Sequence, residues 1–125
     1  MFYHARNGSV RSGNSEMYYI SFGNGNKNLV MLPGLGDGLA TVRGMAFAFA
    51  VMYRIYAEKF TVYVFSRKND LQEGYSTREM AKDQAEAMAA LGIAKAVILG
   101  ISQGGMIAQY LAVDYPDLAD KLILA

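Results

Sequence analysis

Residues 96–105 read AVILGISQGG, and this short stretch decides how the rest of the chain is interpreted. Its first four residues form a continuous apolar run, which is typical of a β-strand buried on both faces. Three glycines then surround Ser102, and a helical pattern follows directly from about Gln103. A strand that turns straight into a helix holds the residue at the bend in a strained backbone conformation. The stretch therefore predicts a strand, a sharp bend at Ser102 and a helix.

The residues around Ser102 match the G-x-S-x-G pattern of a nucleophile elbow. Gly100 and Gly104 supply the small neighbours that such a bend needs, and the bend would lift the serine hydroxyl clear of the sheet. The unpaired N–H groups at the helix start would face developing negative charge. Ser102 is therefore the candidate catalytic nucleophile, and the Gln103 backbone N–H is a candidate oxyanion donor. Alternatively, the glycines only close a turn and Ser102 caps the helix.

A second glycine-rich loop, PGLGDG at residues 33–38, follows an apolar run. Open α/β sheets bind ligands beyond the carboxyl ends of their strands, where both loops are expected. Gly34 and Gly36 would let the backbone approach a substrate closely, so that the Leu35 N–H is the candidate second oxyanion donor. The alternative is an ordinary surface loop.

The remaining sequence alternates between apolar runs and helical segments. Ser76 and Glu79 have the spacing of a capping box at a helix start, and Gly92 suits the end of that helix. Asn7-Gly8 predicts a hairpin turn near the amino terminus. Together the patterns predict one α/β domain over residues 1–125, with a mostly parallel sheet wrapped by helices on both faces. The strands are expected at residues 17–22, 28–32, 60–65, 96–99 and 122–124, and the helices at 43–58, 76–91 and 103–115.

Composition excludes several classes of protein. With 53% hydrophobic and 18% charged residues, the chain is globular and not disordered. The net charge of +1 is made of scattered residues, so no nucleic acid or anionic lipid partner is expected. The absence of cysteine removes a disulfide framework, a zinc knuckle and a thiol nucleophile, and no cofactor or metal is expected. The most apolar stretch, residues 44–53, is too short to span a bilayer, and a cytoplasmic location is favoured.

The sequence resembles the α/β-hydrolase superfamily, in particular its single-domain esterase, lipase and peptidase-like members. The resemblance rests on LVMLPG at residues 29–34, on the helix before the elbow strand and on VILGISQGGM at residues 97–106. It implies hydrolysis of a small-molecule ester, thioester or amide through an acyl-serine. Pro33 is a departure, because many relatives carry histidine at that position to support the loop.

The larger departure is the missing triad partners. In this superfamily the acid and the histidine follow the nucleophile in the chain, yet only Asp114, Asp117 and Asp120 supply carboxylates after Ser102, and no histidine does. The three aspartates are expected to be solvated surface charges, and the sole histidine, His4, a solvated strand residue. We therefore expect the amino-terminal portion of a hydrolase, truncated after about the sixth strand and nearly inactive alone.

Residues 122–125 would form an edge strand with unprotected apolar side chains, open to self-association. A non-catalytic relative that keeps the fold for binding is the first alternative. A dinucleotide-binding domain is less favoured, because Leu39 stands where the fingerprint of Gly34, Gly36 and Gly38 needs its next glycine. Substrate identity and oligomeric state are not specified by these patterns.

Overall fold

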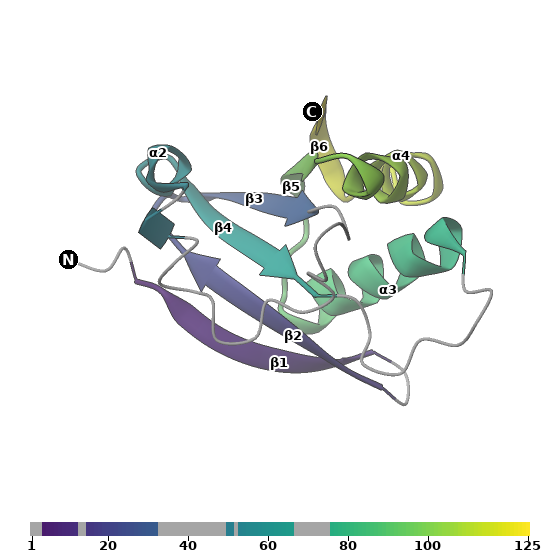
Figure 1. Cartoon of the computed structure of the whole chain (residues 1–125), viewed down its shortest axis with the longest axis horizontal. Helices are drawn as coiled ribbons and strands as arrows, with labels where there is room; N and C mark the ends of the chain where they lie inside the picture. The colour runs from purple at the N-terminus through teal and green to yellow at the C-terminus, as the bar shows by residue number, and fades with distance from the viewer. Residues whose placement is uncertain (1–3, 13–14, 33–49, 52, 67–75) are drawn as a thin grey trace.

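The computed structural model describes residues 4–12, 15–32, 50–51, 53–66 and 76–125. They form a six-stranded sheet with the order β1-β2-β4-β3-β5-β6 (Figure 1). The strands β3, β4, β5 and β6 run parallel, whereas β1 and β2 form an antiparallel pair joined to β4. The strand bounds are Arg6–Ser12 for β1, Ser15–Phe22 for β2, Lys27–Leu32 for β3, Phe60–Phe65 for β4, Ala96–Gly100 for β5 and Ala119–Leu124 for β6.

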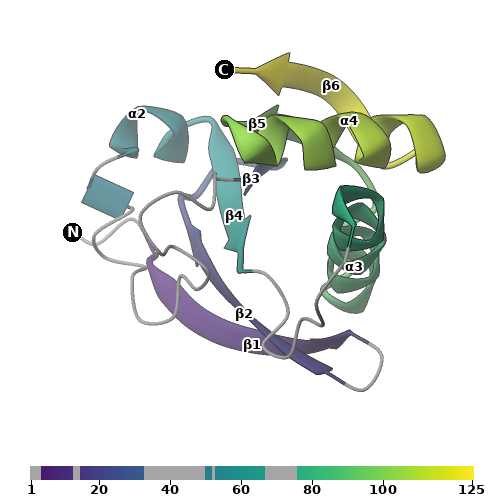
Figure 2. The ribbon, with the colours of Figure 1, turned by 45° about the vertical axis from the view of Figure 1, so that its right-hand side comes forward.

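Helices cover both faces of this sheet, as the sequence predicts. The helix α3 (Thr77–Ala90) and the helix α4 (Gln103–Asp114) pack on one face, and the short helix α2 (Arg54–Ala57) lies on the other (Figures 1 and 2). Alternate residues of one strand enter the two cores: in β3, the side chains of Val30 and Leu32 join one cluster, and those of Leu29 and Met31 join the other. This alternation follows from the two-residue period of a strand.

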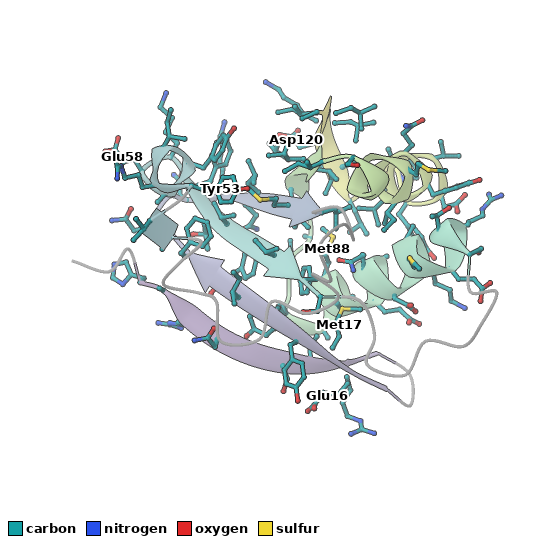
Figure 3. The ribbon with its side chains drawn as sticks, in the orientation of Figure 1. Glu16, Met17, Tyr53, Glu58, Met88 and Asp120 are labelled. Atoms are coloured by element: carbon teal, nitrogen blue, oxygen red, sulfur yellow. The ribbon has the colours of Figure 1, made fainter. Side chains whose placement is uncertain are left out.

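Counting only the described residues, the α3 face holds the larger of the two clusters. Met17 of β2 and Met88 of α3 are both fully buried in it, and Figure 3 shows them reaching into the space between sheet and helix. The helix begins where the sequence indicates: Ser76 accepts a hydrogen bond from the Glu79 N–H, and the Glu79 side chain accepts one from the Ser76 N–H. Gly92, with φ of 75°, follows its end.

The predicted hairpin turn at Asn7-Gly8 is wrong. Both residues lie inside β1, where Asn7 pairs with Ile20 and Gly8 pairs with Tyr19. A side chain at Gly8 would meet the Tyr19 ring at 2.6 Å, so this glycine makes room for an aromatic ring on the neighbouring strand. A glycine required by cross-strand packing and a glycine required by a turn give the same local signal.

The predicted helix at residues 43–58 falls largely outside the described residues. Within the described part it is not continuous, because Tyr53 has φ of −115° and ψ of 30° and serves as the N-cap of α2. Ala50 and Ala57 are nevertheless buried in the core on this face. Two alanines of the predicted helix are thus buried, but in the described part the single long helix is wrong.

Candidate active site

Ser102 stands at the junction between β5 and α4, at the carboxyl edge of the parallel strands. It is the N-cap of α4, with φ of 56° and ψ of −122°. Such values are sparsely populated by residues that carry a side chain and cost on the order of 1–3 kcal/mol. The strand therefore bends sharply at the position that the sequence predicts, and the Ser102 side chain is exposed.

The Ser102 side chain makes no capping hydrogen bond to α4. An N-cap serine ordinarily has an extended backbone and accepts a hydrogen bond from the second or third N–H of its helix, as Ser76 does for α3. Ser102 has neither feature. The alternative that Ser102 is a simple helix cap is therefore wrong.

Gly100 is required by close packing of the backbone. A Cβ atom at this position would lie 2.6 Å from Gly105 Cα and 2.8 Å from both Gly104 O and Ala108 Cβ. The first turn of α4 thus rests directly on the last residue of β5. Gly105 and Ala108, three positions apart on one face of α4, are the residues that Gly100 approaches. Their helical spacing is the sequence signal that could have identified this contact.

Backbone hydrogen bonds to the neighbouring strands and to α4 hold the bend in place. The Ile101 N–H donates to Leu32 O at 3.0 Å, and the Ser102 N–H donates to Ala125 O at 3.1 Å. The Gly105 N–H donates to Ser102 O at 2.9 Å. The contact with Ala125 joins the neighbouring strand to the elbow, and no motif in the sequence indicates it.

Gln103 is the first residue of α4. Its backbone N–H therefore has no acceptor within the helix and lies directly beside the exposed serine. The positive end of the helix dipole would also favour negative charge there. The role of this N–H as an oxyanion donor stays a prediction. Gly34, Leu35 and Gly36, which carry the second predicted donor, lie outside the described residues.

His4 is far from Ser102. β1 lies four positions from β5 in the sheet, roughly 19 Å at the usual strand spacing. Because β1 runs in the same direction as β4, its amino-terminal end lies at the edge of the sheet opposite Ser102. His4, two residues before β1, is exposed. It lies too far away to act as general base for Ser102 within one chain.

The three carboxylates after Ser102 are equally remote. Asp114 lies twelve residues further along α4, about 18 Å at the helical rise. Asp120 and Lys95 line a hollow at the amino ends of the strands, opposite the elbow, and Asp117 is exposed in the preceding turn. The described residues therefore bring Ser102 and the Gln103 N–H together, and they place no carboxylate from this set beside them.

Asp114 differs from the solvated charge that the sequence suggests. The Arg78 guanidinium donates two hydrogen bonds to its carboxylate, Nε to Oδ2 at 2.8 Å and Nη2 to Oδ1 at 2.6 Å. These bonds hold the pKa of Asp114 below its usual value. The same guanidinium lies 5.4 Å from the centre of the Tyr110 ring. Asp114 thus joins α3 to α4. No local sequence pattern predicts this ion pair, because its two residues are 36 positions apart.

Comparisons with known proteins agree with the fold. The family model described as alpha/beta hydrolase fold matches residues 27–125. The chain is 30% identical over 108 residues to epoxide hydrolase 1 of Caenorhabditis elegans, covering 86% of this chain and 27% of that protein. It is 29% identical over 116 residues to epoxide hydrolase 4 of Mus musculus, covering 92% of this chain and 32% of that protein. It therefore spans about a third or less of these curated relatives.

A solved structure extends the likeness in fold. Epoxide hydrolase CorEH matches with a TM-score of 0.81 at 24% identity, covering 97% of this chain and 42% of that chain. The observed strand order also differs from the 3-2-1-4-5-6 order of dinucleotide-binding sheets, which argues against that alternative. Within the part of the chain that the structure describes, no helix has the length and apolarity needed to cross a membrane. From the family match and the sheet topology together, the chain belongs to the alpha/beta hydrolase fold family.

Proposed function

We propose that this chain carries the nucleophile of a hydrolase that cleaves small-molecule esters, thioesters or amides through an acyl-serine. The observation that carries the proposal is the backbone of Ser102, whose φ of 56° and ψ of −122° hold an exposed side chain with no capping hydrogen bond. Strain of this kind persists only where the surrounding structure imposes it, and it gathers at functional sites. Gly100 permits the first turn of α4 to pack closely on β5 beside this bend.

The proposed reaction begins with attack of Ser102 Oγ on the substrate carbonyl carbon. The carbonyl oxygen becomes an oxyanion, for which the Gln103 N–H, and by proposal the Leu35 N–H, provide hydrogen bonds. Collapse of the tetrahedral intermediate expels the alcohol, thiol or amine, which takes up a proton, and leaves an acyl-serine. Water then attacks the acyl-serine in the same way and releases the acid.

The reaction also needs a base to accept the Ser102 proton. His4 and the carboxylates that follow Ser102 lie away from the elbow, as described above. We therefore propose that the triad acid and histidine belong to residues outside this sequence, and that the 125-residue chain alone retains only the weak activity of binding and oxyanion stabilisation. Strong Ser102-dependent turnover by this chain alone would contradict this part of the proposal.

Epoxide hydrolysis is the second candidate, because two curated relatives are named epoxide hydrolases. Attack of Ser102 Oγ on an epoxide carbon would open the ring but leave a hydroxyalkyl ether on the enzyme. Water does not cleave an ether readily, whereas it does cleave the ester of an acyl-serine. A serine nucleophile therefore favours an acyl substrate, and an epoxide would have to be opened by water directly, without a covalent intermediate.

Labelling with a fluorophosphonate tests the role of Ser102. The probe forms a stable phosphonyl ester with an activated serine and loses fluoride, so that intact-mass analysis shows one added group. We expect labelling of Ser102 in the protein that contains its acid and histidine, none in Ser102→Ala, and unchanged labelling in Ser76→Ala, which removes another exposed serine. Labelling that survives Ser102→Ala, or no labelling of the complete protein, would favour the non-catalytic alternative.

Substrate assays separate the two hydrolase candidates. An acyl hydrolase should release p-nitrophenolate from a short p-nitrophenyl ester in a burst, with a transient acyl-serine detected by mass. An epoxide hydrolase should convert styrene oxide to its diol without a covalent adduct on Ser102. Diol formation that is retained in Ser102→Ala, with no ester turnover, would overturn the acyl-serine mechanism.

A further inference from the structure

Gln84 is a polar side chain in the middle of an apolar helix face. It belongs to α3, and 0% of its surface is exposed. Its neighbours one turn before and one turn after are Met80, Ala81, Ala87 and Met88, all members of the apolar cluster on this face of the sheet. Figure 3 shows Met88 pointing into the space between the helix and the sheet. Apolar residues are the usual occupants of such a position, so the glutamine calls for a physical reason.

Only one end of the Gln84 amide is hydrogen-bonded. Its Nε2 donates to Ser66 O at 3.3 Å. Its Oε1 is buried and has no hydrogen-bond partner in the part of the chain that the structure describes. A buried acceptor without a partner costs free energy, because it has lost its hydrogen bonds to water. The glutamine is therefore unfavourable for the fold at this end, and the bond to Ser66 is what it provides.

Ser66 directly follows β4, and two different elements hold its backbone. Its N–H donates to Tyr18 O of β2 at 2.8 Å, and its carbonyl oxygen accepts from Gln84 of α3. The residue itself is only 2% exposed. The sheet and the helix together therefore fix the point at which the chain leaves β4.

The strand register places Ser66 at the same edge of the sheet as the candidate nucleophile. Met31 of β3 pairs with Val64 of β4 on one side and with Leu99 of β5 on the other. Two residues further along, Ser66 is therefore level with Ile101, the residue before the elbow serine. Two strand spacings separate them, roughly 10 Å. This distance is too long for contact with the reacting carbonyl group, but it is within reach of a more remote part of a bound substrate.

We propose that Gln84 is a positioning residue for substrate binding, which holds Ser66 O and so fixes the end of β4 as a wall beside the remote part of the substrate. The inference rests on the proposed function, acyl transfer to Ser102. Gln84 is buried and touches no substrate, so it acts through Ser66. Displacing a substrate-contacting group by about 1 Å can lower a rate by about 100-fold. Gln84 therefore controls the choice between long and short substrates, through their binding.

Gln84→Met separates the positioning role from packing. Methionine is unbranched and adaptable, so it fills the same apolar space while removing both polar atoms. In the protein that contains the acid and the histidine, we expect a urea midpoint no lower than that of the parent, because the unpaired acceptor is gone. Hydrogen exchange at the Ser66 amide should nevertheless become faster. Lys82→Met, at an exposed position of the same helix, is the matched control and should leave that exchange unchanged.

Three thioesters with the same reacting group test the effect on substrate choice. S-ethyl thioacetate is the short reference, S-ethyl thiooctanoate extends the acyl side, and S-octyl thioacetate extends the leaving group. Release of the thiol gives kcat and KM for each. In Gln84→Met we expect the ratio of kcat/KM for one of the long substrates to that for the short one to fall by about tenfold or more, mainly through KM. Lys82→Met should keep the parent's ratios.

The outcomes distinguish this inference from the proposed function. If the parent is active but Gln84→Met loses activity equally on all three thioesters, or keeps the parent's ratios, Gln84 has only a structural role and the inference is wrong. A lower urea midpoint with unchanged ratios leads to the same conclusion. If instead the parent shows no turnover that depends on Ser102, the proposed function is wrong, and the inference is overturned with it.

Discussion

At the scale of single residues, the elbow depends on one strained backbone conformation and one close approach. Ser102 has the strained backbone, and Gly100 has the close contact with α4. Substitutions can separate these two roles. A side chain at position 102 destabilises the fold through strain in the backbone conformation, whereas a side chain at position 100 destabilises it through a clash with α4.

Ser102→Gly is expected to stabilise the fold. Glycine adopts positive φ without a Cβ clash, so that much of a strain of about 1–3 kcal/mol is relieved, less about 0.5–1 kcal/mol for the greater freedom of glycine in the unfolded chain. Chemical denaturation should show a net gain of about 1 kcal/mol. Ser102→Ala, which keeps the Cβ atom, is the control and should gain little. Equal stabilities of the two variants would count against strain at this residue.

Gly100→Ala is expected to destabilise the fold by about 1–3 kcal/mol, because the new methyl group meets backbone atoms of the first turn of α4. Gly105→Ala is the matched control. A Cβ atom there has ordinary contacts, the nearest at 3.6 Å to Leu124, and alanine favours a helix over glycine by about 0.5–1 kcal/mol. Thermal melts should therefore move in opposite directions for the two variants.

At the scale of elements, the ends of α3 depend on local chemistry. Ser76→Ala removes the capping box and is expected to lower stability by about 1 kcal/mol. Thr77→Ala, at the next position, has no capping interaction to lose and should have a smaller effect. Urea denaturation followed by circular dichroism measures both. A larger loss for Thr77→Ala would show that the cap does not control this helix.

The elements that the sequence predicts best are those with local signals. Ser76, Glu79 and Gly92 mark both ends of α3, and the elbow carries its own glycines. The errors arise where distant parts of the chain decide the outcome. Gly8 mimics a turn residue because its partner ring belongs to Tyr19 on another strand, and Asp114 resembles a surface charge because its partner, Arg78, lies on a different helix.

At the scale of the whole molecule, the Arg78–Asp114 pair joins α3 to α4 at the end of α4 remote from Ser102. The candidate site and this ion pair therefore lie at opposite ends of α4. The sheet topology explains the placement of the site, because the carboxyl ends of β3, β4 and β5 meet at one edge, and parallel strands alone can bring them there. Two loops that flank this edge lie outside the described residues.

The ion pair predicts a pH dependence of stability. The hydrogen bonds from Arg78 lower the pKa of Asp114 in the folded state below its ordinary value of 3.8. The unfolded state therefore binds more protons in the interval between the folded pKa and 3.8, and stability rises with pH through that interval. The contribution is fully present above pH 3.8 and is lost as the pH falls through the folded pKa.

Asp114→Asn should thus be less stable than the parent chain at pH 7, and this difference should shrink when the pH falls below the folded pKa of Asp114. Both side chains reach solvent, with exposures of 61% for Arg78 and 23% for Asp114, so the effect is small and should weaken in high salt. Asp117→Asn, at an exposed position, is the control for removal of a charge. A difference that is independent of pH would exclude the ion pair as its source.

The hydrogen bond from the Ser102 N–H to Ala125 O ties the elbow to the end of β6, the neighbour of β5 in the sheet. Proteins open locally at a lower free energy than that of global unfolding. An opening that separates Ala125 from the elbow would free the Ser102 amide. We therefore expect contacts that hold β6 against β5 to keep the Ser102 backbone in its bent conformation from a distance.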